Sequence, residues 1–349
     1  MPIKVLVVDD SIVYRTKLQL SLSKDPEITV VGCASNADEA MKKITALNPD
    51  VITLDIEMPN MNGLEFLEML LPKRPMPVVV VTSLPVNALD ALSRGAVEFV
   101  KKPEAGVDTP DAFISNLVEI LKVAAKAKVS VRSAPQRASD NSPSVQRQVS
   151  SPPRAVPPLN TNKIVAIGAS TGGTEAIISV VKNLPANSPP VLIVQHMPPK
   201  FTQLYAERLN SICNMKAKEA VDKDRVVPGQ IILGAGGYQM SLHKDEKGYY
   251  IRSVPGEKVS GHCPSVDVLF SSVAEIAGRS SIGVILTGMG SDGAKGLTSM
   301  KNKGAYTIGQ NKDSCVVYGM PMEALKLGGV SKQLPLDQIC DELIQKLSM

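Results

Sequence analysis

The sequence predicts two doubly wound α/β domains, each built around a parallel sheet, joined by a flexible linker. Short apolar runs alternate with amphipathic stretches over residues 1–123, and a second alternation covers residues 162–349. Between them, residues 124–161 are dominated by Ser, Pro, Gln and Arg, with little hydrophobic periodicity. Such a segment buries too little apolar surface to offset the entropy lost on ordering, so we expect it to be a linker.

The expected strands are short and apolar, and the stretches between them are helical in pattern, which implies parallel βαβ units. In the first domain the predicted strands are Lys4–Val8, Val51–Leu54, Val78–Thr82 and Glu98–Val100. In the second domain they are Ile164–Ile167, Val191–Val194, Ile231–Leu233, Ile282–Leu286 and Ala305–Ile308. Residues 229–252 hold two adjacent glycines and a turn between alternating segments, which predicts an antiparallel hairpin interrupting the parallel sheet.

Composition excludes several classes of protein. The net charge of +4 is small for 349 residues and the aromatic content is 3% with no Trp, so we expect no binding to nucleic acid. The apolar runs are far shorter than the roughly 20 residues that cross a bilayer, so we expect no membrane insertion. The N-terminus lacks a signal-peptide pattern, which favours the cytoplasm. Five widely spaced cysteines without a Cys-x-x-Cys pair indicate reduced thiols, not disulfides or a zinc site.

Three acidic residues of the first domain follow predicted strands. Asp9 and Asp10 end one strand and Asp55 ends another, while Thr82 and Lys102 follow two more. Because the carboxyl ends of parallel strands share one rim, these side chains should converge there. Carboxylates that close need a cation, and Mg²⁺ prefers such oxygens. Asp9 or Asp10 taken alone is about equally consistent with a helix cap.

The complete set of motifs is more specific than any one acid. Val-Asp-Asp-Ser at 8–11, Asp-Ile-Glu-Met-Pro at 55–59, Thr-Ser at 82–83 and Lys-Lys-Pro at 101–103 resemble the receiver domain of two-component response regulators. The resemblance covers nearly all of residues 1–123. It implies a flavodoxin-like fold and phosphorylation of Asp55 by a chemotaxis histidine kinase.

The same resemblance implies a role for each matching residue. Mg²⁺ would be held by Asp10, Asp55 and the backbone carbonyl of Glu57, with Asp9 supporting it through water. The residues that would sense the phosphoryl group are Thr82, Phe99 and Lys102. Lys102 is preferred to Lys101 because it directly precedes the proline.

The second domain has candidates for nucleophilic catalysis at its predicted strand ends. Ser170, His196 and Asp292 each follow a predicted strand, where an open α/β sheet forms its ligand crevice. A serine hydroxyl becomes nucleophilic when a base takes its proton, and a carboxylate fixes the tautomer of that base. The flanking glycines would let the serine stand clear of the backbone and bring helix N–H groups toward developing negative charge.

Other interpretations of these motifs remain open from the residues alone. A Gly-rich turn after a strand is more often a nucleotide loop, but Ser170 replaces the glycine that would approach a pyrophosphate, and no lysine follows Gly173. His262-Cys263 could indicate a thiol nucleophile, although sequence neighbours seldom align as nucleophile and base. A non-catalytic response regulator and a nucleotide-dependent oxidoreductase are the competing functions.

Four motifs of the second domain resemble the chemotaxis protein-glutamate methylesterase family. They are Ile-Gly-Ala-Ser-Thr-Gly-Gly at 167–173, Val-Gln-His-Met-Pro at 194–198, Gly-His-Cys-Pro-Ser-Val-Asp at 261–267 and Leu-Thr-Gly-Met-Gly-Ser-Asp-Gly-Ala at 286–294. The resemblance covers about residues 162–349 and implies a Rossmann-like methylesterase domain. The order of receiver, linker and esterase also matches that family.

This resemblance implies a serine esterase that acts on methyl-accepting chemoreceptors. Ser170 would be the nucleophile, His196 the base and then the acid, and Asp292 its partner, with the Met289 N–H in the oxyanion hole and Thr171 nearby. The substrate would be a glutamate methyl ester, yielding methanol, with deamidation of receptor glutamines as a further activity. We expect a monomer that needs no cofactor for ester hydrolysis. One departure is Gln239, where the family pattern leads us to expect a histidine before Met240.

Overall fold

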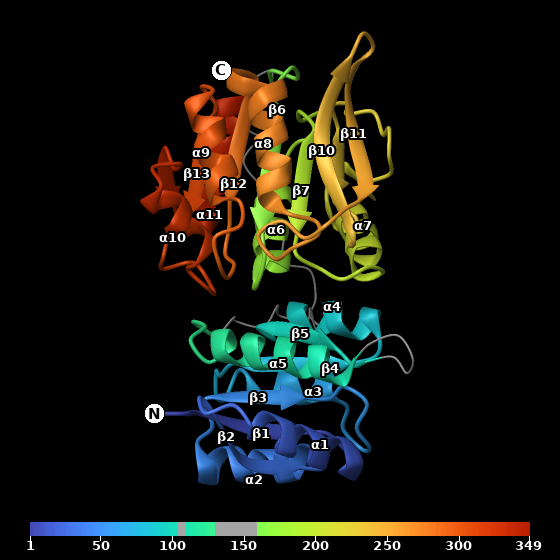
Figure 1. Cartoon of the computed structure of the whole chain (residues 1–349), viewed down its shortest axis with the longest axis vertical. Helices are drawn as coiled ribbons and strands as arrows, with labels where there is room; N and C mark the ends of the chain where they lie inside the picture. Colours follow the sequence, from blue (N-terminus) through green and yellow to red (C-terminus); the bar gives the residue numbers. More distant parts are fainter. Residues whose placement is uncertain (104–108, 130–158) are drawn as a thin grey trace, which may run out of the picture.

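The computed structural model describes residues 1–103, 109–129 and 159–349. They form two α/β domains stacked along the long axis of the molecule (Figure 1). The predicted parallel sheets are confirmed, because neighbouring strands pair in parallel throughout both main sheets of the described residues.

The N-terminal domain has a five-stranded sheet in the order β2-β1-β3-β4-β5. Its strands are β1 Ile3–Val8, β2 Ile28–Ala34, β3 Val51–Leu54, β4 Val78–Thr82 and β5 Glu98–Lys101. Its helices are α1 Ile12–Leu22, α2 Ala37–Leu47, α3 Gly63–Leu70, α4 Pro85–Ser93 and α5 Pro110–Ala124.

The central strands of this sheet are apolar on both faces because helices cover both. On β1, Leu6 and Val8 pack with apolar residues of α2, α3 and α4, whereas Val5 and Val7 pack with those of α1 and α5. β3 and β4 are buried at every position. This two-sided burial explains why these strands are continuous apolar runs with no alternation.

The C-terminal domain has a seven-stranded sheet in the order β14-β13-β12-β6-β7-β9-β8. Its strands are β6 Ile164–Ala169, β7 Val191–Gln195, β8 Lys216–Glu219, β9 Gln230–Leu233, β12 Ser281–Ile285, β13 Tyr306–Gln310 and β14 Lys332–Leu334. Its helices are α6 Gly173–Val181, α7 Phe201–Ile212, α8 Val266–Ile276, α9 Ala294–Asn302, α10 Met320–Lys326 and α11 Leu336–Leu347, with a 3₁₀ turn at Gly278–Ser280.

Helices cover both faces of this sheet as well. Val165 and Ile167 of β6 pack with apolar residues of α6, α7 and α11, and the alternate residues Ile164 and Ala166 pack with those of α8, α9 and α10. The predicted hairpin is present as β10 Tyr238–Asp245 and β11 Gly248–Pro255, but it forms a separate antiparallel sheet that packs against α8. The hairpin therefore lies between β9 and β12 in the sequence, but its two strands pair with each other and not with the strands of the seven-stranded sheet.

Three strands have no counterpart among the predicted bounds: β2, β8 and β14. All three lie at sheet edges, where one side of the strand has no neighbour. β8 reads Lys-Ala-Lys-Glu and β14 reads Lys-Gln-Leu, so neither offers the apolar run on which the other predictions rest. Charged edge strands of this kind also discourage pairing with another chain.

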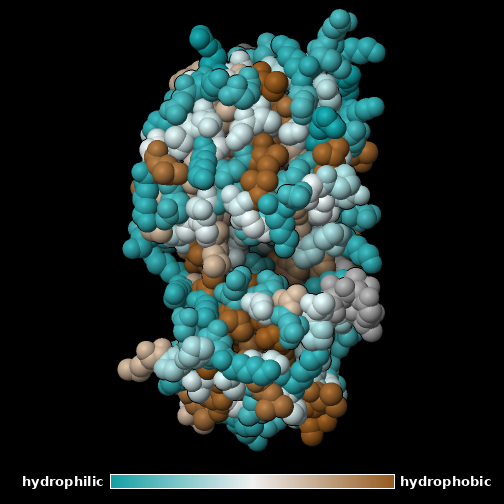
Figure 2. All heavy atoms as spheres, in the orientation of Figure 1, coloured by the Kyte–Doolittle hydropathy of each residue, from teal (hydrophilic) through white to brown (hydrophobic). Residues whose placement is uncertain are grey.

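The two domains meet through β5 and α4 on one side and α6 and α7 on the other (Figure 1). The ring of Phe99 stacks on Phe201, with centroids 4.5 Å apart and planes 14° from parallel. Arg208 of α7 donates from Nη1 to the backbone oxygen of Leu89 in α4 at 2.9 Å. Figure 2 shows that the surface narrows into a waist between the domains, with apolar residues beside it. Among the described helices, none has the length and apolarity to cross a membrane.

Candidate active site

Ser170 and His196 are brought together by the register of two neighbouring strands. β6 pairs with β7 so that Ala169 lies opposite Gln195, and the next residue of each strand is a candidate catalytic residue. The backbone N–H of His196 donates to the carbonyl of Ala169 at 3.2 Å, which continues this pairing. The Gln195 amide donates to the Ser170 carbonyl at 2.9 Å and fixes the turn that carries the serine.

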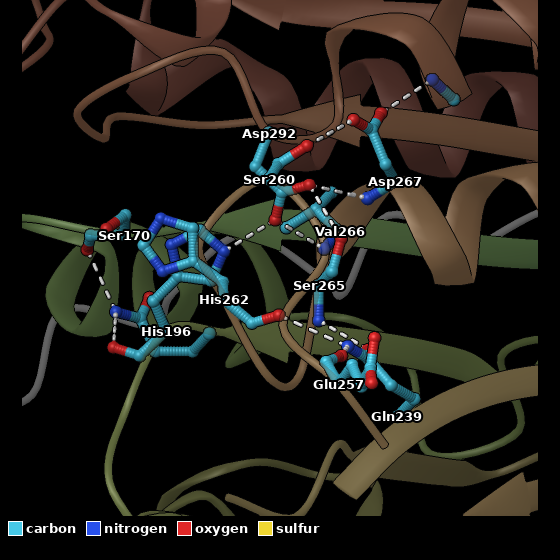
Figure 3. Close-up of polar contacts among 12 residues, drawn as sticks. Ser170, His196, Gln239, Glu257, Ser260, His262, Ser265, Val266, Asp267 and Asp292 are labelled. Carbon is cyan, nitrogen blue, oxygen red and sulfur yellow. Dashed lines mark hydrogen bonds and ion pairs between the residues drawn. The ribbon is translucent and has the colours of Figure 1, made fainter. Parts of the chain in front are cut away.

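His196 and Asp292 are hydrogen-bonded although they are far apart in the sequence. The distance from His196 Nε2 to Asp292 Oδ2 is 2.7 Å (Figure 3). A carboxylate can only accept, so Nε2 carries the proton and Nδ1 is left with a lone pair. Nδ1 is buried and has no hydrogen-bond partner within the part of the chain that the structure describes. The imidazole therefore keeps one nitrogen without a partner, and Ser170 Oγ is not hydrogen-bonded to it in this structure.

Asp292 is anchored by the start of α8 as well as by His196. Its carboxylate accepts from Ser265 Oγ and Val266 N, both at 2.7 Å, and from Asp267 N at 3.0 Å. Two of these donors are the first N–H groups of a helix, which have no partner within the helix and carry its positive end. Burial opposes the ionisation of Asp292, but the bonds from His196, Asp267 and Ser265 outweigh it and lower its pKa.

The loop after β12 passes close to the serine. A Cβ on Gly288 would lie 2.7 Å from the Ser170 Cβ and 2.3 Å from Met320 Sδ, so this position has no space for a side chain. The Ser170 N–H donates to the neighbouring Thr287 carbonyl at 3.0 Å. Met289 follows with a side chain that is 44% exposed. The loop therefore carries the backbone of Met289 past the nucleophile while its side chain points to solvent.

Gln239 has a structural role that its sequence context did not reveal. It is buried, its Nε2 donates to the carbonyls of Glu257 and His262 at 2.9 and 3.1 Å, and its Oε1 accepts from Ser265 N at 2.9 Å (Figure 3). One amide thus holds the loop that leads into α8. A side chain occupied in this way is not available to contact a substrate.

The alternative of a thiol nucleophile receives no support from the surroundings of Cys263. Burial is the main influence on its thiol and raises its pKa. An activated cysteine needs the opposite shift, toward the thiolate.

In the N-terminal domain, the acidic cluster converges as predicted. Carboxylate oxygens of Asp9, Asp10 and Asp55 lie within 4.8 Å of one another, a donor set and spacing that fit Mg²⁺. Lys102 Nζ bridges two of them, at 3.0 Å from Asp9 Oδ2 and 2.7 Å from Asp55 Oδ2. Burial raises the pKa of Asp55 in spite of Lys102, so a further cation would favour its charged form.

Thr82, Glu57 and Phe99, the other predicted site residues of this domain, do not all lie at the acidic cluster. Thr82 is fully buried at the end of β4, and its hydroxyl accepts from Leu84 N at 3.1 Å. Glu57 follows Asp55 and donates its backbone N–H to that carboxylate. Phe99 lies on the face that meets the C-terminal domain, where its ring contacts Phe201. β5 therefore links the interface residue Phe99 to Lys102, which directly follows the strand and bonds to Asp55.

Comparison with known proteins connects both sites to one family. The model of the CheB methylesterase family matches residues 165–343, and that of the response regulator receiver domain matches residues 5–114. The chain belongs to the CheB methylesterase family. It is a hydrolase that combines a receiver domain with a methylesterase domain, as the two resemblances implied.

Relatives of similar length support this assignment. A protein-glutamate methylesterase/protein-glutamine glutaminase 2 of Syntrophomonas wolfei is 46% identical over 347 residues, covering 99% of this chain and 98% of that protein. A protein of the same kind from Rhizobium johnstonii, numbered 1, is 47% identical over 355 residues, covering 99% and 96%. The crystal structure of the Thermotoga maritima CheB methylesterase catalytic domain superposes with a TM-score of 0.52 at 38% identity, covering 53% of this chain and 98% of that one.

In this methylesterase, one residue of the domain interface was missed by sequence analysis. Glu98 of β5 is hydrogen-bonded to the side chain of Thr171, which directly follows Ser170. Loss of water at the interface raises the pKa of Glu98 to about 7. No local motif marks this glutamate, because its partner is supplied by the other domain. Ser265 and Gln239 were likewise given no role, although Ser265 stands in a motif that precedes an apolar helix.

We predict that Gly288→Ala lowers esterase activity by at least about 100-fold, because the added methyl group would displace Ser170. The matched control is Gly234→Ala, whose new Cβ would have its nearest contacts at an ordinary 3.4 Å. Both variants would be assayed with melting temperature measured in parallel. Normal turnover by a folded Gly288→Ala protein would show that the serine does not depend on this close packing.

Proposed function

We propose that this chain is a phosphorylation-activated methylesterase that hydrolyses glutamate methyl esters on chemoreceptors, releases methanol, and also deamidates receptor glutamines. The observation that carries the proposal is the 2.7 Å bond between His196 Nε2 and Asp292 Oδ2 at the strand ends where Ser170 also lies. Family membership supports the substrate class and a kinase as phosphodonor, acting in the cytoplasm.

In the first half of the proposed reaction, His196 Nδ1 takes the proton of Ser170 Oγ as the oxygen attacks the ester carbonyl. Asp292 stabilises the imidazolium through Nε2. The carbonyl oxygen becomes negative near the Met289 backbone N–H and the N-terminal end of α6, which begins at Gly173. Because these N–H donors would already point toward the negative oxygen, they would stabilise the transition state without having to move.

The attack of Ser170 Oγ gives a tetrahedral species. In the second half of the reaction this species collapses, and the leaving methoxide takes the proton from His196, which releases methanol. The acyl group remains on Ser170 until a water, deprotonated by His196, attacks it. The bond to Ser170 Oγ then breaks, Oγ takes the proton from His196, and the glutamic acid product leaves and ionises. A glutamine side chain would react in the same way and release ammonia. The two activities therefore need one site, with a nitrogen or an oxygen as leaving atom.

Control is proposed to begin at Asp55. Its carboxylate would accept a phosphoryl group while Asp10, Asp55 and the Glu57 carbonyl hold Mg²⁺, with Asp9 supporting through water. Mg²⁺ would neutralise charge on the phosphoryl oxygens. Thr82 and Lys102 would bind these oxygens, and the added charge of roughly −1.5 to −2 would turn the Thr82 hydroxyl toward the phosphoryl group.

The domain interface suggests how this signal would reach the esterase. Three contacts support occlusion: Phe99 stacks on Phe201, Arg208 bonds to Leu89, and Glu98 bonds to Thr171 beside the nucleophile. In the unphosphorylated protein the receiver would thus limit access to Ser170. Movement of Phe99 after phosphorylation would remove the stacked contact and favour the open arrangement.

The triad assignment predicts that Ser170→Ala and His196→Ala each lower methanol release from methylated receptor by several orders of magnitude. Asp292→Ala should cost less turnover because its side chain orients the base and does not react, although it also removes the acceptor at the start of α8. Circular dichroism would establish that each variant is folded. Near-normal methanol release by Ser170→Ala would refute the assignment.

The occlusion hypothesis predicts that a protein lacking residues 1–123 is at least about tenfold more active than the unphosphorylated full chain, since a few kcal/mol of interface energy keeps most molecules closed. Asp55→Ala should retain basal activity and lose its response to acetyl phosphate with Mg²⁺. If the truncated enzyme is no faster than the full chain, the receiver must instead act by direct activation.

The Glu98 contact predicts a pH dependence of basal activity. The closed interface raises its pKa from an ordinary 4.5 to about 7, so the closed form binds the proton more tightly and is favoured as the pH falls below 7. The closed-to-open ratio should rise by up to about tenfold per pH unit between pH 7 and 5. We expect the activity ratio of truncated to full-length enzyme to be larger at pH 6 than at pH 8.

The matched variant for this prediction is Glu98→Gln, which keeps a hydrogen-bonding group but has no titratable proton. Its activity ratio should be the same at pH 6 and pH 8. A pH-dependent ratio that survives in Glu98→Gln would assign the effect to another group.

A further inference from the structure

A second imidazole lies directly on the proposed base. The ring of His262 stacks on that of His196, with centroids 3.6 Å apart and planes 9° from parallel. Figure 3 shows the two rings together between Ser170 and Asp292. His262 comes from the loop between β11 and α8, so it approaches His196 from a different element than either Ser170 or Asp292.

The hydrogen bond to Asp292 does not by itself fix the orientation of His196. It holds one ring atom, Nε2, and the ring can still tilt about that point. A second constraint is needed to keep Nδ1 aimed at the serine. A parallel ring in van der Waals contact supplies it, because tilting His196 would drive its atoms into His262.

His262 can stack there because it carries no charge at working pH. Burial is the main cause that lowers its pKa to about 4, the nearby His196 and Lys258 act in the same direction, and Asp292 opposes them. His196 lies at the end of β7, Asp292 lies in the loop after β12, and Lys258 lies in the same loop as His262. Two stacked imidazolium ions would repel each other, so a neutral neighbour allows His196 to become positive during the reaction.

The loop that carries His262 is held in place from the hairpin. Gln239 of β10 donates to the carbonyls of His262 and Glu257, and accepts from Ser265 N. Ser265 in turn donates to Asp292. The same short loop thus sets the position of the stacked ring and of the carboxylate, so both neighbours of His196 are aligned together.

We propose that His262 is a positioning residue, which fixes the plane of the His196 ring with Nδ1 toward Ser170 and stays neutral so that His196 can accept a proton. This inference rests on the proposed function. Gln239 supports His262 by clamping its loop, which gives this amide a role in place of the substrate contact that a histidine there would suggest.

The test compares His262→Ala, His262→Phe and His262→Arg in the full chain with acetyl phosphate and Mg²⁺ present, measuring methanol release from methylated receptor. We expect His262→Ala to lower kcat by about 10- to 100-fold with little change in KM, because a misplaced base costs rate more than binding. His262→Phe should recover most of kcat, since it restores a flat neutral ring.

The pH profile separates positioning from simple filling of space. His262→Arg places a fixed positive charge against His196, so it should lower kcat and move the acid limb of the kcat profile to lower pH. His262→Phe should leave that limb where it is in the wild type. The control is His243→Phe, because His243 stacks on Tyr250 in the hairpin and bonds to Ser241, outside the triad.

The outcomes distinguish this inference from the proposed function. Activity that survives Ser170→Ala would overturn the function itself. If Ser170→Ala is inactive while His262→Ala keeps wild-type kcat, only the role of His262 is refuted. The role is also refuted if His262→Phe is as slow as His262→Ala, or if His262→Arg leaves the acid limb unchanged. Should His262→Ala fail to fold, the Phe and Arg variants, which retain bulk, still decide.

Discussion

The burial of the Asp292 carboxylate is the constraint on which the catalytic domain depends. Removing a carboxylate from water costs several kcal/mol unless donors replace the lost hydration. Here the donors come from two places in the chain: His196 after β7, and Ser265 with the first two N–H groups of α8. The same interaction therefore caps a helix, joins it to the loop after β12, and fixes the tautomer of the base. The stability of the domain and the geometry of the catalytic residues therefore both depend on the Asp292 carboxylate. A substitution that removes its hydrogen bonds would affect both.

Much of this arrangement follows from the sequence because parallel strands end at a common rim. Ser170, His196 and Asp292 could be assigned together since each follows an apolar run, and Asp9, Asp55 and Lys102 could be assigned by the same reasoning. Contacts that involve irregular backbone could not be predicted in this way. Gln239 lies in the hairpin and bonds to the carbonyls of Glu257 and His262, which are 18 and 23 residues further along the chain, in a loop. The edge strands β8 and β14 were missed because they are polar and short.

The interface shows a different limit of sequence analysis. A resemblance to two families predicts two domains but not which residues of one touch the other. Glu98 belongs to no motif and Thr171 to the motif of the nucleophile in the other domain, and only their contact makes the glutamate a group that loses water near the nucleophile. The interface combines one stacked aromatic pair, a few hydrogen bonds and a partly buried carboxyl whose ionisation opposes closure. Such an interface suits a switch, because modest changes in charge or ring position alter the balance between closed and open forms.

The most direct measurement of the central claim is the tautomer of His196, determined by nitrogen-15 NMR on the full chain labelled at its three histidines. The signals would be assigned with His243→Phe and His262→Phe. The account predicts that near neutral pH the His196 proton resides on Nε2, facing Asp292, and that Nδ1 is unprotonated. Replacing Asp292 by Ala should abolish this preference. A proton on Nδ1 in the wild-type protein would contradict the account, because the nitrogen proposed to activate Ser170 would then have no lone pair to accept its proton.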